Sequence, residues 1–262
     1  MQLDDKLNIT VYKTFPERGA APIRSQLPLL LAEGRTLMSG KTLMERRLGA
    51  SDESRKNWEN NYFHIALLNV RDPTTEEVRA VLANEHPDLL AKITPEADLT
   101  RDYGLPVKPE EYADMEGFTF NSGEVSRLQG DVYSLPSKRQ AFWEFVAEGD
   151  TKLLQDYREM VSKVTGKAED KVMGVYPSSR QGARLWCADG LGGRSSARGY
   201  SLGDGSGRLV GVAPEAQVAI SDGQLVAPNL SRILATSKPF VAEASREDFE
   251  RSVSGLYKKG GE

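Results

Sequence analysis

Imidazole and thiol side chains often carry proton transfer or nucleophilic attack, and this chain has few of them. It contains one cysteine, Cys187, and two histidines, His64 and His86. Local spacing suggests no Ser/His/Asp or Cys/His arrangement, so any such pairing has to come from the fold. His64 lies inside an apolar run and His86 directly precedes Pro87, which favours structural roles for both. A single cysteine also excludes an intrachain disulfide and a multi-cysteine zinc site.

The stretch from Gly34 to Thr42 has part of the pattern of a phosphate-binding loop. Such loops need Gly, four residues and then Gly-Lys-Thr, so that backbone amides surround the phosphates and the lysine reaches them. Here five residues separate the two glycines, which changes the loop geometry. The alternative is a surface turn before a basic helix that carries Arg46 and Arg47.

The spacing of the carboxylates indicates neither a general acid/base pair nor a calcium site. Glu110 and Glu111 are adjacent, so their side chains point apart on a helix or strand, and we expect a solvated acidic loop. Asp189 and Asp204 are too sparse for calcium, which takes several clustered oxygen ligands. We therefore expect no catalytic residue, no metal and no cofactor.

The composition is that of an ordinary globular protein, with 262 residues, 39% hydrophobic and 27% charged, and a formal net charge of -4. So small a charge gives no reason to expect a nucleic-acid partner. No apolar run approaches the roughly 18 to 20 residues that span a bilayer. The polar, acidic start MQLDDKLNIT is unlike a signal peptide. We expect synthesis in the cytosol, with any surface location reached by assembly into a larger particle or by a route without a signal peptide.

One stretch, residues 187–213, has an unusual composition. It contains no Lys, Gln, Glu, Met, Trp or Asn, although the first five types make up about a fifth of the whole chain. A flexible Gly/Ser linker is one explanation, but apolar residues recur at intervals that suit short strands. We therefore predict ordered β-structure with loops. The residues expected in the core beneath them are Trp186, Leu209, Val210 and Val212.

Two strands and a helix are expected in the first part of the chain. Residues 7–12 alternate apolar and polar types, which predicts a strand, and the apolar run at residues 62–70 predicts a buried strand. Asp72 and Pro73 suit the start of a helix over residues 74–93. The following Pro-, Asp- and Glu-rich segment, which ends at residue 117, predicts a domain boundary.

Beyond this segment the pattern predicts short strands and then two helices. The strands are expected to break at Gly123 and Gly130. Ser137, with Gln140 three residues later, predicts a capping box at the start of a helix. Asp150 is expected to cap a second, amphipathic helix.

That second helix is expected to end at Gly166, and residues 171–177 then predict a strand. After Ile220, the strand-like PFVAEA and a helix from Ser245 predict a C-terminal extension. It either packs on the N-terminal part or holds an oligomer together.

The order of these features resembles a known family. Several segments are similar to those of C-type lectin-fold proteins of the formylglycine-generating-enzyme type. They are Leu135, Pro136 and Ser137, followed by Phe142 to Phe145, and then Trp186 and the closing GRLVGVAP. The resemblance covers residues 118–220. It implies an α+β fold with short twisted strands and two helices. The implied parts are an N-terminal α/β segment (1–116), a C-type lectin-like ligand-binding domain (117–222) and a C-terminal extension (223–262).

Departures from that family narrow the function that it implies. Cys187 alone does not supply the cysteines of formylglycine-generating enzymes, and the Glu-Pro-Asn, Gln-Pro-Asp and Trp-Asn-Asp triplets of calcium-dependent lectins do not occur. What remains resembles the variable proteins of diversity-generating retroelements, in which adenines of a template are randomised on copying. Asn codons altered in this way cannot encode Lys, Gln, Glu, Met or Trp, all missing from residues 187–213. General depletion of bulky and charged types in Gly-rich loops is the alternative.

The resemblance implies a non-enzymatic protein whose variable face binds a protein or other macromolecule, as in receptor binding. The residues expected to project from the turns toward the ligand are Asp189, Leu191, Arg194, Ser196, Arg198, Tyr200, Leu202, Asp204 and Ser206. Tyrosine offers a rigid amphipathic contact and arginine offers forked donors, unless the arginines only solubilise the turns. Two other functions stay open: an enzyme for a nucleotide or phosphorylated ligand at Gly34 to Thr42, and a structural component of a virus particle.

Overall fold

The computed structural model describes residues 9–12, 22–192, 196–203, 207–212, 220–221 and 224–225. The chain divides into two compact units, Met1–Ala213 and Pro214–Glu262. In the second unit, β10 (Ile220–Ser221) pairs antiparallel with β11 (Gln224–Leu225). The strand and helix expected near PFVAEA and Ser245 lie outside the described residues.

The described residues of the first unit form a mixed α+β structure. Its α-helices are α1 (Ile23–Ala32), α2 (Gly40–Gly49), α3 (Asp52–Asn60), α4 (Pro87–Ala91), α5 (Pro109–Ala113), α6 (Ser122–Gly130), α7 (Pro136–Val146) and α8 (Thr151–Thr165). Its strands are β1 (Ile9–Tyr12), β2 (Thr36–Leu37), β3 (Phe63–Arg71), β4 (Val78–Leu82), β5 (Phe118–Phe120), β6 (Gly174–Tyr176), β7 (Gly182–Ala188), β8 (Ser196–Tyr200) and β9 (Arg208–Val212). Two 3₁₀ helices are Ala83–Glu85 and Glu169–Lys171.

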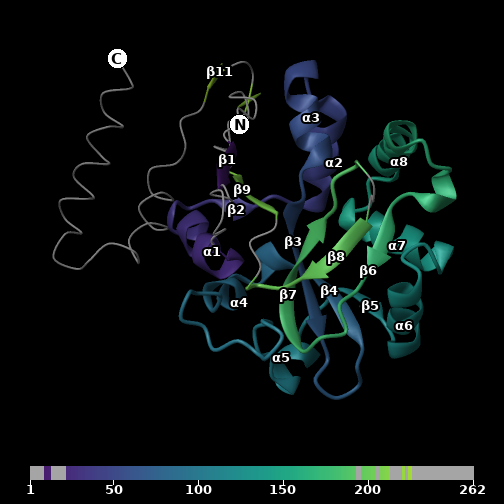
Figure 1. Ribbon diagram of the computed structural model, residues 1–262. Helices are drawn as coiled ribbons and strands as arrows, with labels where there is room; N and C mark the ends of the chain where they lie inside the picture. Colours follow the sequence, from purple (N-terminus) through teal and green to yellow (C-terminus); the bar gives the residue numbers. More distant parts are fainter. Residues whose placement is uncertain are drawn as a thin grey trace, which may run out of the picture. The chain divides into compact units, whose positions relative to one another are not determined.

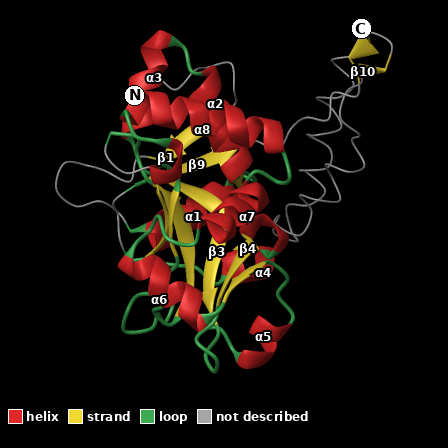
Figure 2. Ribbon diagram, turned by 90° about the vertical axis from the view of Figure 1, so that its right-hand side faces the viewer, coloured by secondary structure: helices red, strands yellow, loops and turns green. Residues whose placement is uncertain are grey.

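The strands form one open, mixed sheet in the order β1-β9-β3-β7-β8-β6. β2 also pairs with β9, and β4 pairs with β3 and β5. The pairs β3–β9 and β6–β8 are parallel, and the others are antiparallel. Figure 2 shows β3 and β4 side by side, as their pairing requires. Strands from both sides of the expected boundary near residue 117 therefore share one sheet.

β3 lies at the centre of this sheet and confirms the buried strand expected at residues 62–70. Eight of its nine residues are buried, and successive side chains enter opposite faces of the sheet. Ile65 and Leu67 join a first core with α2, α7 and α8. Leu68 and Val70 join a second core with α1 and α4. Figure 1 shows α7 and α8 on one side of the sheet and α1 and α4 on the other.

The prediction of a helix over residues 74–93 is wrong for the first half of that segment, where the chain forms a hairpin. Oδ1 of Asp72 accepts hydrogen bonds from the N–H groups of Thr74 and Thr75, at 2.6 and 3.2 Å, so this residue shapes a turn instead of capping a helix. β4 then pairs with β3, and Val78 and Val81 are fully buried. Valine packs well on a pleated sheet, and this pairing outweighs the local helix signals. The helical part of the segment is short, as α4.

Two helix starts differ from the expected ones. Asn121 caps α6, because its Oδ1 accepts from the Glu124 N–H at 2.9 Å while Glu124 Oε2 accepts from the Asn121 N–H at 3.0 Å. Residues expected as broken strands after β5 are therefore helical. α7 begins at Pro136, directly after Leu135 in a left-handed conformation with φ of 53°. Ser137 thus lies inside the helix, and the capping box expected there is wrong.

Other predicted ends are confirmed. Oδ1 of Asp150 accepts from the N–H of Leu153 at 2.9 Å and caps α8. Gly166 ends that helix with φ of 66°, a conformation that glycine adopts without steric cost. The strands expected at residues 7–12 and 171–177 occur as β1 and β6.

The acidic segment before residue 117 is more ordered than a solvated loop. Glu111 lies in the first turn of α5, where it accepts from the Lys108 N–H at 2.9 Å and from Lys92 Nζ at 2.6 Å. These hydrogen bonds lower the pKa of Glu111. Among the residues that the structure describes, no helix is both long and apolar enough to cross a membrane.

Candidate functional site

Most of the described residues that were expected to face a ligand are buried. Those with at most 3% of their surface exposed are Asp189, Leu191, Ser196 and Leu202. The prediction that these side chains project outward is therefore wrong. Arg198 and Tyr200 are partly exposed. The expected contact residues that lie outside the described part of the chain are Arg194, Asp204 and Ser206.

The two leucines are buried because they anchor the chain on either side of β8. Leu191 packs in the first core, and its N–H donates to the carbonyl oxygen of Glu59 at 2.5 Å. Leu202 packs in the second core, and its N–H donates to the carbonyl oxygen of Tyr103 at 3.1 Å. Burying one leucine side chain contributes about 1.5–3 kcal/mol. The predicted core residues Trp186, Leu209 and Val210 are confirmed as fully buried, and Val212 is partly buried.

Asp189 is buried and forms an ion pair with the partly exposed Arg198. Nε of Arg198 donates to Oδ2 of Asp189 at 2.8 Å. The guanidinium of Arg198 also lies 5.8 Å from the centre of the Tyr176 ring, within the range of a cation–π contact. Contacts to two neighbours therefore position this arginine before any ligand arrives.

Arg198 and Tyr200 line a pocket of about 300 Å³ at the end of β8. We call it the arginine pocket, and its lining residues are Gln129, Tyr176, Ser178, Ser179, Arg180, Arg184, Arg198, Gly199, Tyr200 and Ser201. They come from α6, from β6 and the loop after it, from β7, and from β8 and the residue that follows it. The chain thus brings three arginines and several hydroxyl groups to one place.

Arg184 is the most buried of the three arginines, with 1% of its surface exposed. Its Nη1 and Nη2 donate to the backbone carbonyls of Asp102 and Gln181, at 2.8 and 2.9 Å. In the part of the chain that the structure describes, its Nε has no hydrogen-bond partner. Burial lowers the pKa of Arg184 to about 10, against the opposing effect of the Asp102 carboxylate. The residue is still protonated at neutral pH, so the pocket contains a buried positive charge.

The floor of the pocket depends on a glycine of the unusual stretch. Asn69, fully buried on β3, accepts from the Ser178 N–H at 2.8 Å and donates to the Ser178 carbonyl at 3.1 Å. A β-carbon on Gly199 would lie 2.6 Å from Oδ1 of Asn69 and 2.9 Å from Cβ of Ser178. Only glycine lets β8 approach this hydrogen-bonded pair so closely.

The fold brings Cys187 and His64 together, although their local spacing did not suggest a pair. They are register partners in the antiparallel strands β3 and β7. Both are fully buried, and the rings of His64 and Tyr200 make an edge-to-face contact with centroids 5.8 Å apart. Their burial supports the structural role expected for His64. No group of three or more potential metal ligands occurs among the described residues.

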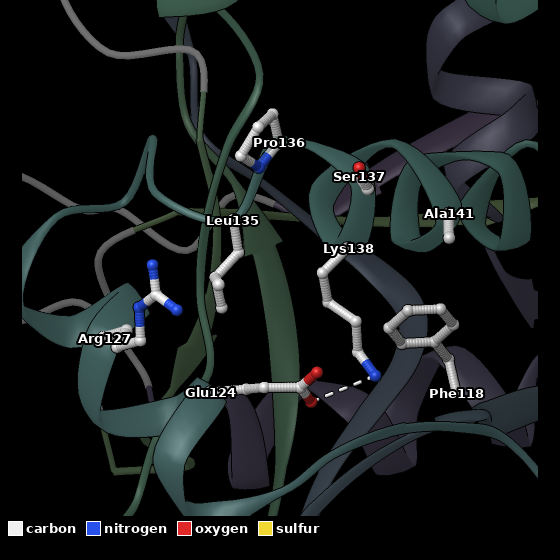
Figure 3. A pocket seen from close by; sticks show the side chains of 8 residues that line it. All are labelled: Phe118, Glu124, Arg127, Leu135, Pro136, Ser137, Lys138 and Ala141. Atoms are coloured by element: carbon white, nitrogen blue, oxygen red, sulfur yellow. Dashed lines mark ion pairs between the residues drawn. The ribbon is translucent and has the colours of Figure 1, made fainter.

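A second hollow, of about 560 Å³, lies beside the start of α7 and is drawn in Figure 3. It is lined by Phe118, Glu124, Arg127, Leu135, Pro136, Ser137, Lys138 and Ala141. Nζ of Lys138 lies 3.0 Å from Oε2 of Glu124, the pair marked by the dashed line, and 4.9 Å from the centre of the Phe118 ring. This lysine and this carboxylate neutralise each other, which leaves one arginine, Arg127, in the lining, against three in the arginine pocket.

The stretch from Gly34 to Thr42 does not have the geometry of a phosphate loop. Oγ of Ser39 accepts from the Thr42 N–H at 3.1 Å and caps α2. A β-carbon on Gly40 would overlap the side chain of Val146, so the helix start is packed against α7. Lys41 lies 3.8 Å from the Asp150 carboxylate. Thr36–Leu37 also form β2, so this stretch is a strand followed by a capped helix start instead of a phosphate-binding loop.

No protein-family model, curated protein or solved structure matches the chain. The arginine pocket therefore has to be argued from its own residues. Sequence reasoning missed Arg180, Arg184 and the serines before them, because it treated only the stretch after Trp186 as ligand-facing. The signal that could have found them is the polar run SSRQGAR, residues 178–184, whose last three residues begin β7, the strand that pairs with β8.

Proposed function

We propose that this chain is a non-enzymatic ligand-binding protein whose binding site is the arginine pocket. The observation that carries the proposal is the arrangement of β8 and its flanks. Arg198 and Tyr200 are partly exposed in the pocket, whereas Leu191 and Leu202, on either side, are buried in the two cores. A surface anchored in this way can change its contact residues without changing its fold.

The proposed scaffold is C-type lectin-like, as the resemblance of residues 118–220 implies. The packing of Trp186 supports this proposal, because its ring centroid lies 4.8 Å from that of Phe142 on α7. In proteins of that fold, helices pack behind the strands that begin at the corresponding tryptophan. Here α7 and α8 share the first core with Trp186.

We further propose that a retroelement diversifies part of residues 187–213. The absence of Lys, Gln, Glu, Met and Trp from this stretch supports the idea. Burial restricts where variation is tolerated, since changing a leucine in a packed core costs about 2–5 kcal/mol. Diversified codons should therefore include those of Arg198, Tyr200 and Ser201, and should spare those of Leu191 and Leu202.

Sequencing the DNA that flanks the gene tests this proposal. We expect a near-copy of the codons for residues 187–213 beside a reverse-transcriptase gene, with adenines wherever the two copies differ. Differences concentrated at the buried leucine codons would contradict the assignment of the binding face. Absence of any such copy would overturn diversification.

Binding itself is tested by building a library randomised at Arg198, Tyr200 and Ser201 and selecting it against an arbitrary folded protein. We expect well-folded binders, because these positions lie on an anchored strand and at its end. A matched library at Leu185, Cys187 and Leu209, all fully buried, is the control and should yield few folded members. Loss of folding in both libraries would refute the proposed binding face.

A further inference from the structure

We infer that the arginine pocket binds an oxyanion, a carboxylate or phosphate group of its ligand. This inference rests on the proposed binding function and specifies the chemistry of the site. Three guanidinium groups line the pocket. Among the described residues, the carboxylates paired with them are Asp189, 2.8 Å from Arg198, and Asp102, 3.7 Å from Arg180. Three positive charges against two negative ones leave one positive charge for a ligand to neutralise.

The serines of the pocket are arranged to donate hydrogen bonds. Oγ of Ser178 accepts from the Arg180 N–H at 3.4 Å, and Oγ of Ser179 accepts from Nε2 of Gln129 at 2.9 Å. Oγ of Ser201 accepts from the Gly203 N–H at 3.2 Å. Each hydroxyl oxygen accepts one of these hydrogen bonds, and its proton can be donated to a ligand. A pocket of O–H and guanidinium donors suits the oxygens of an anion better than a neutral or cationic group.

Arg184 supplies the energetic reason for anion binding. A buried cation whose hydrogen bonds go to neutral carbonyls recovers only part of its hydration free energy. An oxyanion in the pocket would add a second negative charge near this guanidinium, beside that of Asp102. Binding should therefore stabilise the folded protein as well as the complex. A volume of about 300 Å³ accommodates an anionic group and a small part of the molecule that carries it.

Thermal unfolding and calorimetric titration of the full chain test the inference, with inorganic phosphate and glutarate as separate probes. Potassium chloride holds the ionic strength constant, so that general screening does not contribute. We expect a saturable rise in melting temperature with at least one probe. The probe that binds more tightly identifies the phosphate or the carboxylate as the preferred group.

Variants locate the binding. Arg180→Gln should raise the dissociation constant of the bound probe by about fivefold or more, since hydrogen bonds to charged groups contribute more free energy than hydrogen bonds between neutral groups. The side chain of Arg180 is 66% exposed, so this variant should fold. Ser201→Ala should weaken binding less, and Arg127→Gln, an exposed arginine in the hollow of Figure 3, should leave it unchanged.

Two outcomes would overturn the inference. One is the absence of a saturable response to either probe by the folded protein. The other is equal weakening by Arg180→Gln and Arg127→Gln, which would place the anion elsewhere. Neither outcome would refute the proposed binding function, because the flanking DNA and the paired libraries test that proposal without any anion.

Discussion

Nε of Arg198 donates to Oδ2 of Asp189 at 2.8 Å, so a residue that faces the pocket is held by one that is buried. Asp189 has a side chain that is 3% exposed, and that of Arg198 is 23% exposed. Removing one partner of such a pair leaves a charge without its counter-ion, and that usually costs more than the pair contributes. The proposed binding face therefore depends on a residue that is itself almost fully buried.

Asp189→Asn should lower the free energy of unfolding by about 2 kcal/mol, because Arg198 loses its charged partner. Urea denaturation followed by circular dichroism measures the change. Asp156→Asn is the control, since it removes the partner of Lys152 from a largely exposed pair, and it should cost less than about 1 kcal/mol. Equal losses in the two variants would show that Asp189 does not anchor Arg198.

Gly199→Ala should destabilise the protein by about 1–3 kcal/mol, because the new methyl group would push β8 away from Asn69 and Ser178. Thermal unfolding measures the loss. Gly192→Ala is the matched control: its β-carbon would lie 3.5 Å from Oδ1 of Asn60, an ordinary contact. We expect a change of less than about 0.5 kcal/mol there. If both glycines tolerate alanine, the close approach at the pocket floor is not required.

Arg47 lies on α2, the basic helix expected after the Gly34 to Thr42 stretch, and is 2% exposed. It donates to the carbonyl of Trp58 at 3.0 Å, to the hydroxyl of Tyr157 at 2.6 Å and to the carbonyls of Asn61 and Asp189 at 3.2 and 2.9 Å. These bonds tie α2 to α8 and to the end of β7.

Arg47→Met keeps most of the side-chain volume and removes these donors. It should cost about 3 kcal/mol, because the carbonyl and hydroxyl acceptors lose their partners. Arg46→Met, the neighbouring arginine on the same helix, should cost less, because Arg46 is only partly buried. Chemical denaturation of both variants checks the difference. A loss that is no larger for Arg47 would contradict its structural role.

Glu111→Gln tests a pH dependence. Hydrogen bonds from the Lys108 N–H and from Lys92 lower the pKa of Glu111 in the folded protein. Its contribution is therefore present above the unfolded-state pKa, which is about 4.3 for glutamate, and is lost as the pH falls through the lower folded-state pKa. The variant should be less stable than the wild type by less than about 1 kcal/mol at pH 7, since the pair is partly exposed.

That difference should shrink as the pH is lowered through the folded-state pKa, in urea titrations of both proteins. Glu110→Gln, the exposed neighbour, serves as the control and should change stability by less than about 0.5 kcal/mol at pH 7. A difference for Glu111→Gln that is independent of pH would contradict the assignment.

Several elements of this protein depend mainly on neighbouring residues, so the sequence alone predicts them. The apolar run that became β3, the Asp150 cap and the Gly166 end of α8 depend mainly on nearby residues. For the same reason, the sequence predicted that Trp186, Leu209 and Val210 are buried. It also identified residues 187–213 as unusual, from composition.

Only the tertiary structure decided which residues of that stretch are accessible. In the sequence, Leu191 and Leu202 stand among Gly- and Ser-rich residues that are typical of loops. In the structure, each packs in a core built from distant helices and strands. The hairpin at Asp72 likewise forms because β4 finds partners in both β3 and β5. Arg184 and Arg198 meet in one pocket because β7 pairs with β8. Burial and charge compensation depend on such long-range neighbours, which local sequence patterns do not specify.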